Sequence, residues 1–511
     1  MVILAATGLV PREVILVWTG LAIFYMVFSP VSDSLWLVVA SIPLFAALPI
    51  TDNFDTMANW RLLIAVLFLV WLVKELKKYC SSESRTGGTS RELYYLTSRL
   101  ATLARRIKTL PFLNTLTVIF LLIAAFSIGV ADYRILAFKK LLFLINIFLL
   151  FVVVRNKTRN KENILRVWQA AAAGAVMAIV VALGQLVSVW FVPLIYFWQF
   201  WAGRVIDFFY GQNLATLLAY ANTWFSYYNS APPTLRLFSV FPDSHSFAMF
   251  SLLAVPIFLC LGLFYQPKRR FFWLLAGGAL FGAVFSGSRG VWISALPVAA
   301  LALYFWLKGT DKKIPKQAVL SLAVFALIFL ASAAYPVLFY RIQAWQTGQY
   351  SSSTISFFER ARSISDLDEV SNKGRLEIWR NSLSSIVQHP MLGAGLGNFV
   401  TVIGQDVDAV KKGASAHNLY LDITAEIGVP GLLILLLMFA DILRTSWLVW
   451  RQAAESHFKL FGLLFGLYFV WILGYSFFDV VLFNDKVLLF FMVGLATLYS
   501  LRNIIFNPEK I

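Results

Sequence analysis

Long apolar runs, separated by short polar segments, occupy most of this sequence of 511 residues. A helix needs about 20 mainly apolar residues to cross the hydrocarbon core of a bilayer. A shorter apolar stretch, 191–202, carries Tyr196, Trp198 and Trp201, which suit the headgroup layer and indicate an interfacial or re-entrant helix. The full pattern predicts 12 or 13 membrane-spanning helices, at about residues 13–30, 33–50, 60–76, 110–130, 141–155, 166–190, 244–266, 271–288, 290–307, 317–337, 428–449, 460–478 and 486–503.

Composition supports the same class of protein. Hydrophobic residues make up 59% of the chain and charged residues 14%, whereas a soluble domain carries about a quarter charged residues. Lipid offers no hydrogen-bond partner to the backbone, so a spanning segment that is not part of a barrel must be helical. We therefore expect an all-α, polytopic transmembrane helical bundle, and the composition excludes a soluble enzyme.

The net charge of +17, from 43 Lys and Arg and 26 Asp and Glu, bears on orientation. If the predicted spans alternate in direction, 26 basic residues fall in loops on one side, against nine elsewhere outside one long exempt loop. Basic residues of short loops stay in the cytoplasm, so this side is predicted to face the cytoplasm of a cell inner membrane. The orientation in the membrane therefore explains the net positive charge, and binding of a nucleic acid is not needed to explain it.

Four regions follow from this topology. Residues 1–202 are expected to form N-terminal transmembrane helices, and 203–337 a central transmembrane region that carries outer-face arginines. Residues 338–427 form a large periplasmic or extracellular loop with helical stretches, and 428–511 the C-terminal transmembrane helices. A polar segment as long as the third region is too long to be only a connection, which points to function there.

Three polar residues fall at the outer membrane face although they are far apart in sequence: Arg236, Arg289 and His417. Arg289 is the most informative, because the segment 281–299 carries no other charge and a charge there usually faces a polar pathway or partner. A guanidinium group suits the oxygens of a phosphate. Snorkelling to the interface is the competing interpretation for Arg289, and interface anchoring is an equal alternative for Arg236.

His417 is a candidate general base at neutral pH. Ser415 is expected to cap a short helix that runs to about Ile427. At about 100° per residue, Glu426 then lies near the opposite face and is not expected to orient the imidazole of His417. His245, close to Arg236 in sequence, is a second-rank candidate together with Asp243.

Two other motifs allow a structural and a functional interpretation. The glycine-rich block 389–399 could bind phosphate through its backbone amides, but no clear helix follows its glycines, so a structural turn is favoured. The run Asp366, Asp368 and Glu369 could bind a metal, but a solvated acidic loop is favoured because no other ligand cluster accompanies it. We therefore predict no metal site.

These motifs, in this order and topology, resemble the O-antigen ligase and O-antigen polymerase superfamily of membrane glycan transferases. The resemblance covers about residues 230–450. It rests on Arg236 with the following Phe-Pro-Asp-Ser-His-Ser-Phe-Ala, on Ser288-Arg289-Gly290, on Gly374-Arg375 to Trp379 with His389-Pro390-Met391-Leu392-Gly393-Ala394-Gly395, and on His417-Asn418-Leu419-Tyr420-Leu421 with Glu426-Ile427-Gly428 and Gly431-Leu432.

The resemblance implies an inverting, metal-independent glycosyltransferase of the GT-C kind that uses no cofactor. The donor would be an undecaprenyl-diphosphate-linked glycan, and the acceptor hydroxyl would belong to lipid A-core for a ligase or to another lipid-linked glycan for a polymerase. His417 would activate the acceptor, and Arg289 and Arg236 would hold the diphosphate. Many members have an asparagine where this chain has Ser244 or His245. The expected substrate contacts are Asn418, Tyr420, Arg375, Ser288 and His245.

A transporter or flippase for an anionic lipid or small anion is the alternative from another class. Arg289, Arg134, Lys139 and Lys140 would line its path. Such a path requires charges near mid-membrane, and apart from the two lysines the predicted spans largely lack them. A scaffold for other glycan enzymes is a third alternative, but it gives no reason for Arg289 and His417 to occur together.

Overall fold

The computed structural model describes residues 2–50, 57–83, 112–219, 223–228, 231–308, 313–348, 370–404 and 415–506. These residues form a helical bundle with one small β-hairpin, β1 (Phe225–Tyr228) and β2 (Ala231–Leu235), which confirms the all-α class. Short helical segments lie between and around the bundle helices: α1 (Val2–Ala6), α9 (Leu194–Phe200), α10 (Asp207–Tyr210), α11 (Gln212–Ala219), α16 (Tyr335–Thr347), α18 (Val370–Gln388) and α19 (Phe399–Val402).

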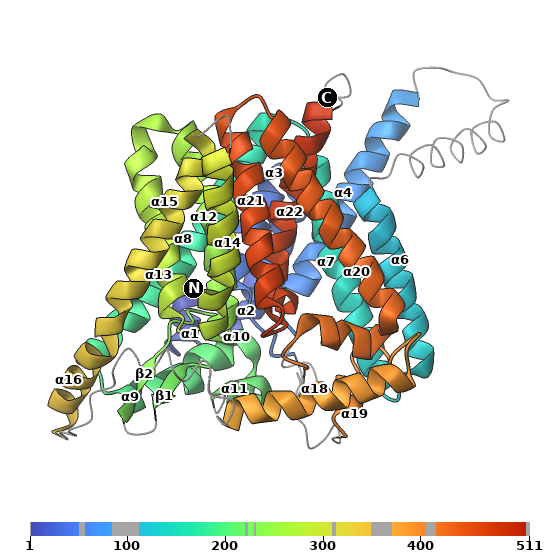
Figure 1. The fold of residues 1–511 in the computed structure, drawn as a ribbon. Coiled ribbons are helices and arrows are strands. Elements are labelled where there is room, and N and C mark those ends of the chain that lie inside the picture. The colour runs from blue at the N-terminus through green and yellow to red at the C-terminus, as the bar shows by residue number, and fades with distance from the viewer. Residues whose placement is uncertain are drawn as a thin grey trace.

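Long apolar helices make up the body of the bundle (Figure 1). Nine helical runs in the described part of the chain are long and apolar enough to cross a bilayer, so the protein is a polytopic membrane protein. The expected total of 12 or 13 crossings stays a prediction. The bundle helices are α2 (Val14–Phe28), α3 (Val31–Ala40), α4 (Trp60–Glu83), α6 (Phe112–Ser127), α7 (Arg134–Lys157), α8 (Lys161–Phe191), α12 (Ser244–Phe264), α13 (Arg269–Phe285), α14 (Arg289–Lys308), α15 (Lys313–Ala331), α20 (Leu419–Gln452), α21 (Ser456–Tyr475) and α22 (Asp485–Phe506).

One of the predicted spans, 33–50, is wrong as a single helix. The helix α3 has only 10 residues and is followed by a short 3-10 turn, Ile42–Leu44. At about 1.5 Å per residue, α3 reaches about 15 Å, half of the hydrocarbon thickness. The chain beyond the turn forms a bridge between Ala47 and Ala58 instead of continuing as a helix.

The two ends of the bundle differ in structure (Figure 1). The hairpin, α9, α10, α11 and α18 gather at one end, which we call the site end. The basic group Lys268, Arg269 and Arg270, at the start of α13, lies at the opposite end. The expected separate helix near 191–202 is confirmed as α9, which begins after Pro193. The helical run from Lys313 continues to Thr347, ten residues beyond the expected end of the central region.

The helix α12 lies at the centre of the bundle and carries His245 at its site end. In the most apolar 18-residue stretch of this helix, 89% of the residues are buried inside the protein. Asp243 caps α12, because one of its carboxylate oxygens accepts a hydrogen bond from the Ser246 amide at 2.6 Å. The first residues of α12 are therefore fixed within the protein rather than in the surrounding lipid.

The glycine-rich block packs against a kink in α20. Gly428 has φ of 76°, and a Cβ at this position would lie 2.3 Å from the Met391 carbonyl oxygen. The Val429 amide donates to Pro390 O at 2.8 Å, and the Ala394 amide donates to Ala425 O at 2.8 Å. The block is thus a structural turn that joins the outer segment to α20, as favoured from the sequence.

Candidate functional site

The backbone of His417 is held between two helices at the site end. His417 has φ of 47°, which is unusual for a residue with a side chain. On one side, the Ala416 amide donates to the Asp422 carboxylate at 2.9 Å, and the Trp379 indole donates to Ala416 O at 2.9 Å. On the other side, the Leu419 amide donates to Ser476 O at 2.8 Å.

The helix after His417 begins three residues later than expected, and a different residue caps it. Asn418 is the N-cap of α20, and its side-chain oxygen accepts hydrogen bonds from the amides of Tyr420 and Leu421 at 3.0 and 3.2 Å. The expectation that Ser415 caps this helix is wrong. The Ser415 hydroxyl instead accepts a hydrogen bond from the His417 amide at 3.4 Å.

Asp479 is the acidic partner of the His417 imidazole. The Nδ1 atom of His417 lies 3.7 Å from Oδ1 of Asp479, which follows α21. The side chain of His417 is 45% exposed and that of Asp479 only 16%. Burial alone would raise the pKa of the Asp479 carboxyl, but His417 and His245 act in the opposite direction and hold this pKa below its ordinary value. The carboxylate therefore stays ionised beside the imidazole at neutral pH.

The glutamate on the same helix has a different role. Glu426 is 2% exposed and pairs with Lys140 of α7 at 2.6 Å. The acidic partner of His417 is Asp479 and not Glu426, in line with the sequence expectation. The pairing also compensates the charge of Lys140 within the bundle, one of the two lysines on which the transporter alternative relied.

A second imidazole, His245, lies within hydrogen-bond distance of two hydroxyl groups. Its Nδ1 atom is 2.8 Å from the Tyr475 hydroxyl and 2.9 Å from Ser288 Oγ. The two hydroxyl oxygens are 3.2 Å apart. We call His245, Ser288 and Tyr475 the His245 triangle. It joins the start of α12, the turn before α14 and the end of α21.

Arg236 lies against the turn that carries Arg289. Its side chain packs on Gly287, where a Cβ would lie 3.1 Å from Arg236 Cγ. The Leu237 amide donates to Phe285 O at 3.0 Å, which joins the strand segment to the end of α13. Arg236 Nε donates to Ser226 Oγ at 2.8 Å. Arg289 is the first residue of α14 and is partly buried.

The charged candidates share one electrostatic neighbourhood. The charges of Arg236, Arg375, His417 and Asp479 all act on His245. Arg375 belongs to α18, which runs across the site end of the bundle (Figure 1). The structure therefore brings together side chains that the sequence separates by up to about 240 positions. Arg289 joins the group through its neighbour Ser288, which contacts His245.

Asp243 adds a second acidic group to this neighbourhood. Burial raises the pKa of Asp243 to about 6, although the amide and hydroxyl of Ser246 both donate to its carboxylate. The charge of Asp479 acts in the same direction as burial. Asp243 therefore changes its charge close to neutral pH.

Two more of the expected substrate contacts, Asn418 and Tyr420, have structural partners. Asn418 is buried as the cap of α20, as described above. The Tyr420 hydroxyl donates to Leu473 O at 2.8 Å, and its ring packs on Phe477 with ring centres 4.6 Å apart. Asn418 fixes the first turn of α20, and Tyr420 joins this turn to the end of α21, which holds His417 near Asp479.

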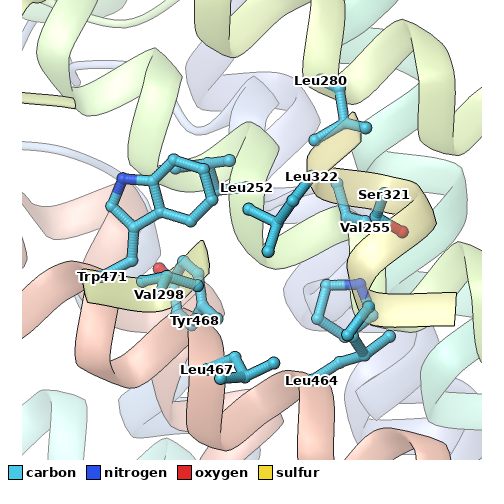
Figure 2. A pocket seen from close by; sticks show the side chains of 12 residues that line it. Leu252, Val255, Leu280, Val298, Ser321, Leu322, Leu464, Leu467, Tyr468 and Trp471 are labelled. Atoms are coloured by element: carbon cyan, nitrogen blue, oxygen red, sulfur yellow. The ribbon is translucent and has the colours of Figure 1, made fainter. Parts of the chain in front are cut away.

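An apolar pocket lies deeper in the bundle on the same helices as the site (Figure 2). Leu252 of α12 and Tyr468 of α21 both line it, and each is seven residues, or about 10 Å along its helix, from a member of the His245 triangle. Leu280 of α13, Val298 of α14 and Ser321 and Leu322 of α15 also line it. The pocket suits a hydrocarbon chain more than a polar ligand.

The acidic residues proposed for a metal alternative fall partly outside the structure. Asp366, Asp368 and Glu369 lie outside the described residues. Among the residues that are described, no group of three or more His, Cys, Asp and Glu side chains could hold a metal ion.

Sequence reasoning missed Asp479 and Tyr475. Asp479 is the only acidic residue between Glu455 and Asp485, and it follows an apolar run directly. Such an isolated charge at the end of a predicted span is itself a functional signal. No comparable signal marks Tyr475, because its role depends on contacts with α12 and on Gly290, where a Cβ would lie 2.7 Å from its ring.

Comparison with known proteins finds one match, which covers part of this region. A family model described as O-antigen ligase matches residues 274–436, from α13 into α20. The matched segment contains Arg289, Arg375 and His417, whereas Arg236, His245 and Asp479 lie outside it. No curated protein matches the chain. Over residues 274–436, the chain is therefore similar to the O-antigen ligase family.

Proposed function

We propose that this protein transfers a glycan from an undecaprenyl-diphosphate carrier to an acceptor hydroxyl, as an O-antigen ligase. The single observation that carries the proposal is the pairing of His417 with Asp479 beside the arginine-bearing turn at one end of the bundle. A base and a group of cations suit a reaction in which a hydroxyl loses a proton while a diphosphate gains charge.

His417 accepts the acceptor proton in this mechanism. Asp479 faces Nδ1, so Nε2 is the nitrogen that takes the proton as the acceptor oxygen attacks the anomeric carbon. The bond from that carbon to the diphosphate oxygen breaks, and the electron pair leaves with the diphosphate. Asp479 stabilises the imidazolium that forms, as a carboxylate does beside a catalytic histidine. Attack opposite the leaving group inverts the anomeric configuration.

Arg289 and Arg236 hold the diphosphate. Guanidinium groups match phosphate oxygens with two parallel hydrogen bonds, and their charge offsets the charge that develops on the leaving group. Because arginine can supply this stabilisation, the reaction we propose is metal-independent. The apolar pocket in Figure 2 supports a lipid-linked donor, since it offers hydrocarbon contacts on the helices that carry the polar site.

The location follows from the charge distribution. The basic group Lys268, Arg269 and Arg270 lies at the end opposite the site, and such groups stay in the cytoplasm. We therefore place the protein in the inner membrane with its site on the periplasmic or extracellular face. The topology and lipid-linked substrate are those of a GT-C enzyme.

Purified protein in lipid, given an undecaprenyl-diphosphate-linked glycan and lipid A-core, tests the proposal. We expect transfer to the acceptor, loss of nearly all turnover in His417→Ala, and weaker donor use in Arg289→Ala. The matched control is Arg134→Ala, at the same end of the bundle but in α7, which should remain active. Undiminished turnover by His417→Ala would reject the mechanism.

The products also separate the alternatives. A single transfer to lipid A-core indicates a ligase, whereas lengthening of the lipid-linked glycan itself indicates a polymerase of the same superfamily. Uptake of a lipid or anion into proteoliposomes without any transfer would instead support a transporter.

A further inference from the structure

His245 is fixed in place by its helix as well as by its two hydroxyl partners. It is the second residue of α12, whose cap is Asp243 and whose body is buried in the bundle. The Tyr475 ring lies against Gly290, which leaves no room for a side chain there. Ser288 is 1% exposed and belongs to the turn before Arg289. The imidazole is therefore held by the start of α12, the turn before α14 and the end of α21 at once.

Both hydrogen bonds of this imidazole to described residues are made by the same nitrogen. Within the described residues, Tyr475 and Ser288 contact Nδ1, and no hydrogen bond is made by Nε2. A single nitrogen that faces two hydroxyl groups can accept a hydrogen bond from one of them, since each hydroxyl is a donor. When Nδ1 accepts, the ring proton is on Nε2.

The surroundings favour this tautomer. Arg236 and Arg375 act on the ring, so its neighbourhood attracts an anion. A lone pair on Nε2 would repel an anionic ligand, whereas an N–H group would donate to it. Asp479 also acts on the ring, but its carboxylate is already paired with His417.

We propose that His245 donates a hydrogen bond from Nε2 to the diphosphate of the lipid-linked donor, and that Tyr475 and Ser288 are positioning residues that keep its proton on that nitrogen. This inference rests on the proposed function, because it takes the donor diphosphate as the anion. It assigns to this chain a third group for the leaving diphosphate beside the two arginines, and a reason for a tyrosine at the end of α21.

Nitrogen-15 NMR of the full protein tests the tautomer without any turnover. The chain has four histidines, so selective labelling gives few signals, and His245→Asn identifies the one of interest. We expect a protonated Nε2 and an unprotonated Nδ1 for His245 near neutral pH. The double variant Tyr475→Phe with Ser288→Ala should release the ring to both tautomers. An unprotonated Nε2 in the parent protein would overturn the proposal.

Binding of undecaprenyl diphosphate, measured in nanodiscs by calorimetry, tests the contact itself. Loss of one donor to a charged group should weaken binding about tenfold or more in His245→Phe, and His245→Asn, which keeps an N–H donor, should recover part of it. His389→Asn, an exposed histidine outside the site, is the matched control. Equal affinity in His245→Phe and the parent protein would overturn the contact.

The outcome can be separated from the fate of the proposed function. If the parent protein neither binds undecaprenyl diphosphate nor transfers glycan, the proposed function fails, and the contact from His245 to the diphosphate fails with it. If the parent protein binds and transfers while both His245 variants match it, only the role of His245 is wrong. A folding defect would be visible as loss of the other histidine signals in the same NMR spectra.

Discussion

The Nδ1 atom of His417 lies 3.7 Å from Oδ1 of Asp479, although the two residues belong to different loops at the site end. The distance is longer than a hydrogen bond, and catalytic contacts often tighten only when substrate is bound. Two hydrogen bonds to backbone carbonyls maintain it: the Leu419 amide donates to Ser476 O, and the Tyr420 hydroxyl donates to Leu473 O. The pair is therefore built by the contact between α20 and α21.

Asp479→Asn should leave the fold intact and lower turnover by about a hundredfold or more. The amide keeps the shape of the carboxylate but cannot stabilise an imidazolium, as in hydrolases whose histidine loses its aspartate. The measurement is the rate of transfer at saturating donor. Asp207→Asn, an aspartate at the same end of the bundle that faces Arg12 at 3.9 Å, is the matched control. Comparable rates for both variants would contradict the role of Asp479.

Gly428→Ala should lower the thermal stability of the protein markedly. The residue has φ of 76°, and its Cβ would lie 2.3 Å from a carbonyl oxygen that cannot move freely. Gly277→Ala in α13 is the matched control, because a Cβ there meets nothing within 4 Å. In a helix, that substitution should be neutral or stabilise by up to about 1 kcal/mol. Thermal unfolding in detergent compares the two, and equal midpoints would argue against the packing of the glycine-rich block.

Lys140→Met should destabilise the protein by about 3–5 kcal/mol, because it leaves Glu426 buried without a partner. The double variant Lys140→Met with Glu426→Gln removes both charges and should recover most of that loss. Chemical unfolding of the two variants and the parent measures the recovery. If the double variant is as unstable as the single one, the 2.6 Å contact is not the source of the effect.

The pKa of Asp243, raised to about 6, predicts a pH-dependent stability. The folded protein holds this proton at pH values where an unfolded aspartate, with a pKa of about 3.9, has lost it. The contribution of Asp243 is therefore fully present below about pH 4 and is lost as the pH rises through 6. Asp243→Asn keeps a capping oxygen but cannot titrate, so its unfolding temperature should change less between pH 5 and pH 7.5 than that of the parent. An unchanged pH dependence in the variant would contradict the raised pKa.

The sequence predicts most of the bundle because the signal for a membrane span is local. Each apolar run contains its own information, and α12 and α22 lie close to their predicted ranges. The end of α3 could not be predicted in this way, because the apolar pattern continues through Pro43 whereas the helix ends before it and the backbone turns. Hydropathy measures transfer into lipid, and it does not register where a chain that is buried in protein stops being helical.

The site also contains residues that the sequence indicates and contacts that only the packing of distant segments creates. Arg289 and His417 could be singled out because a charge in an apolar segment and a histidine before a span are visible locally. The contact of Arg236 with Gly287 could not, since it depends on the backbone bond from Leu237 to Phe285. Asp479 reaches His417 only through the packing of α21 on α20. No sequence pattern in the segment around His417 or in the segment around Asp479 indicates that the two residues are close together.

The anchoring of Ala416 and Leu419 means that the imidazole between them can rotate but cannot travel. Under the proposed mechanism, proton removal then happens at one fixed point in space, whatever the size of the sugar chain that arrives. Selection among acceptors would be a matter of which hydroxyl can be delivered to that point, so variation in specificity should map to the surfaces that guide the acceptor rather than to the histidine loop.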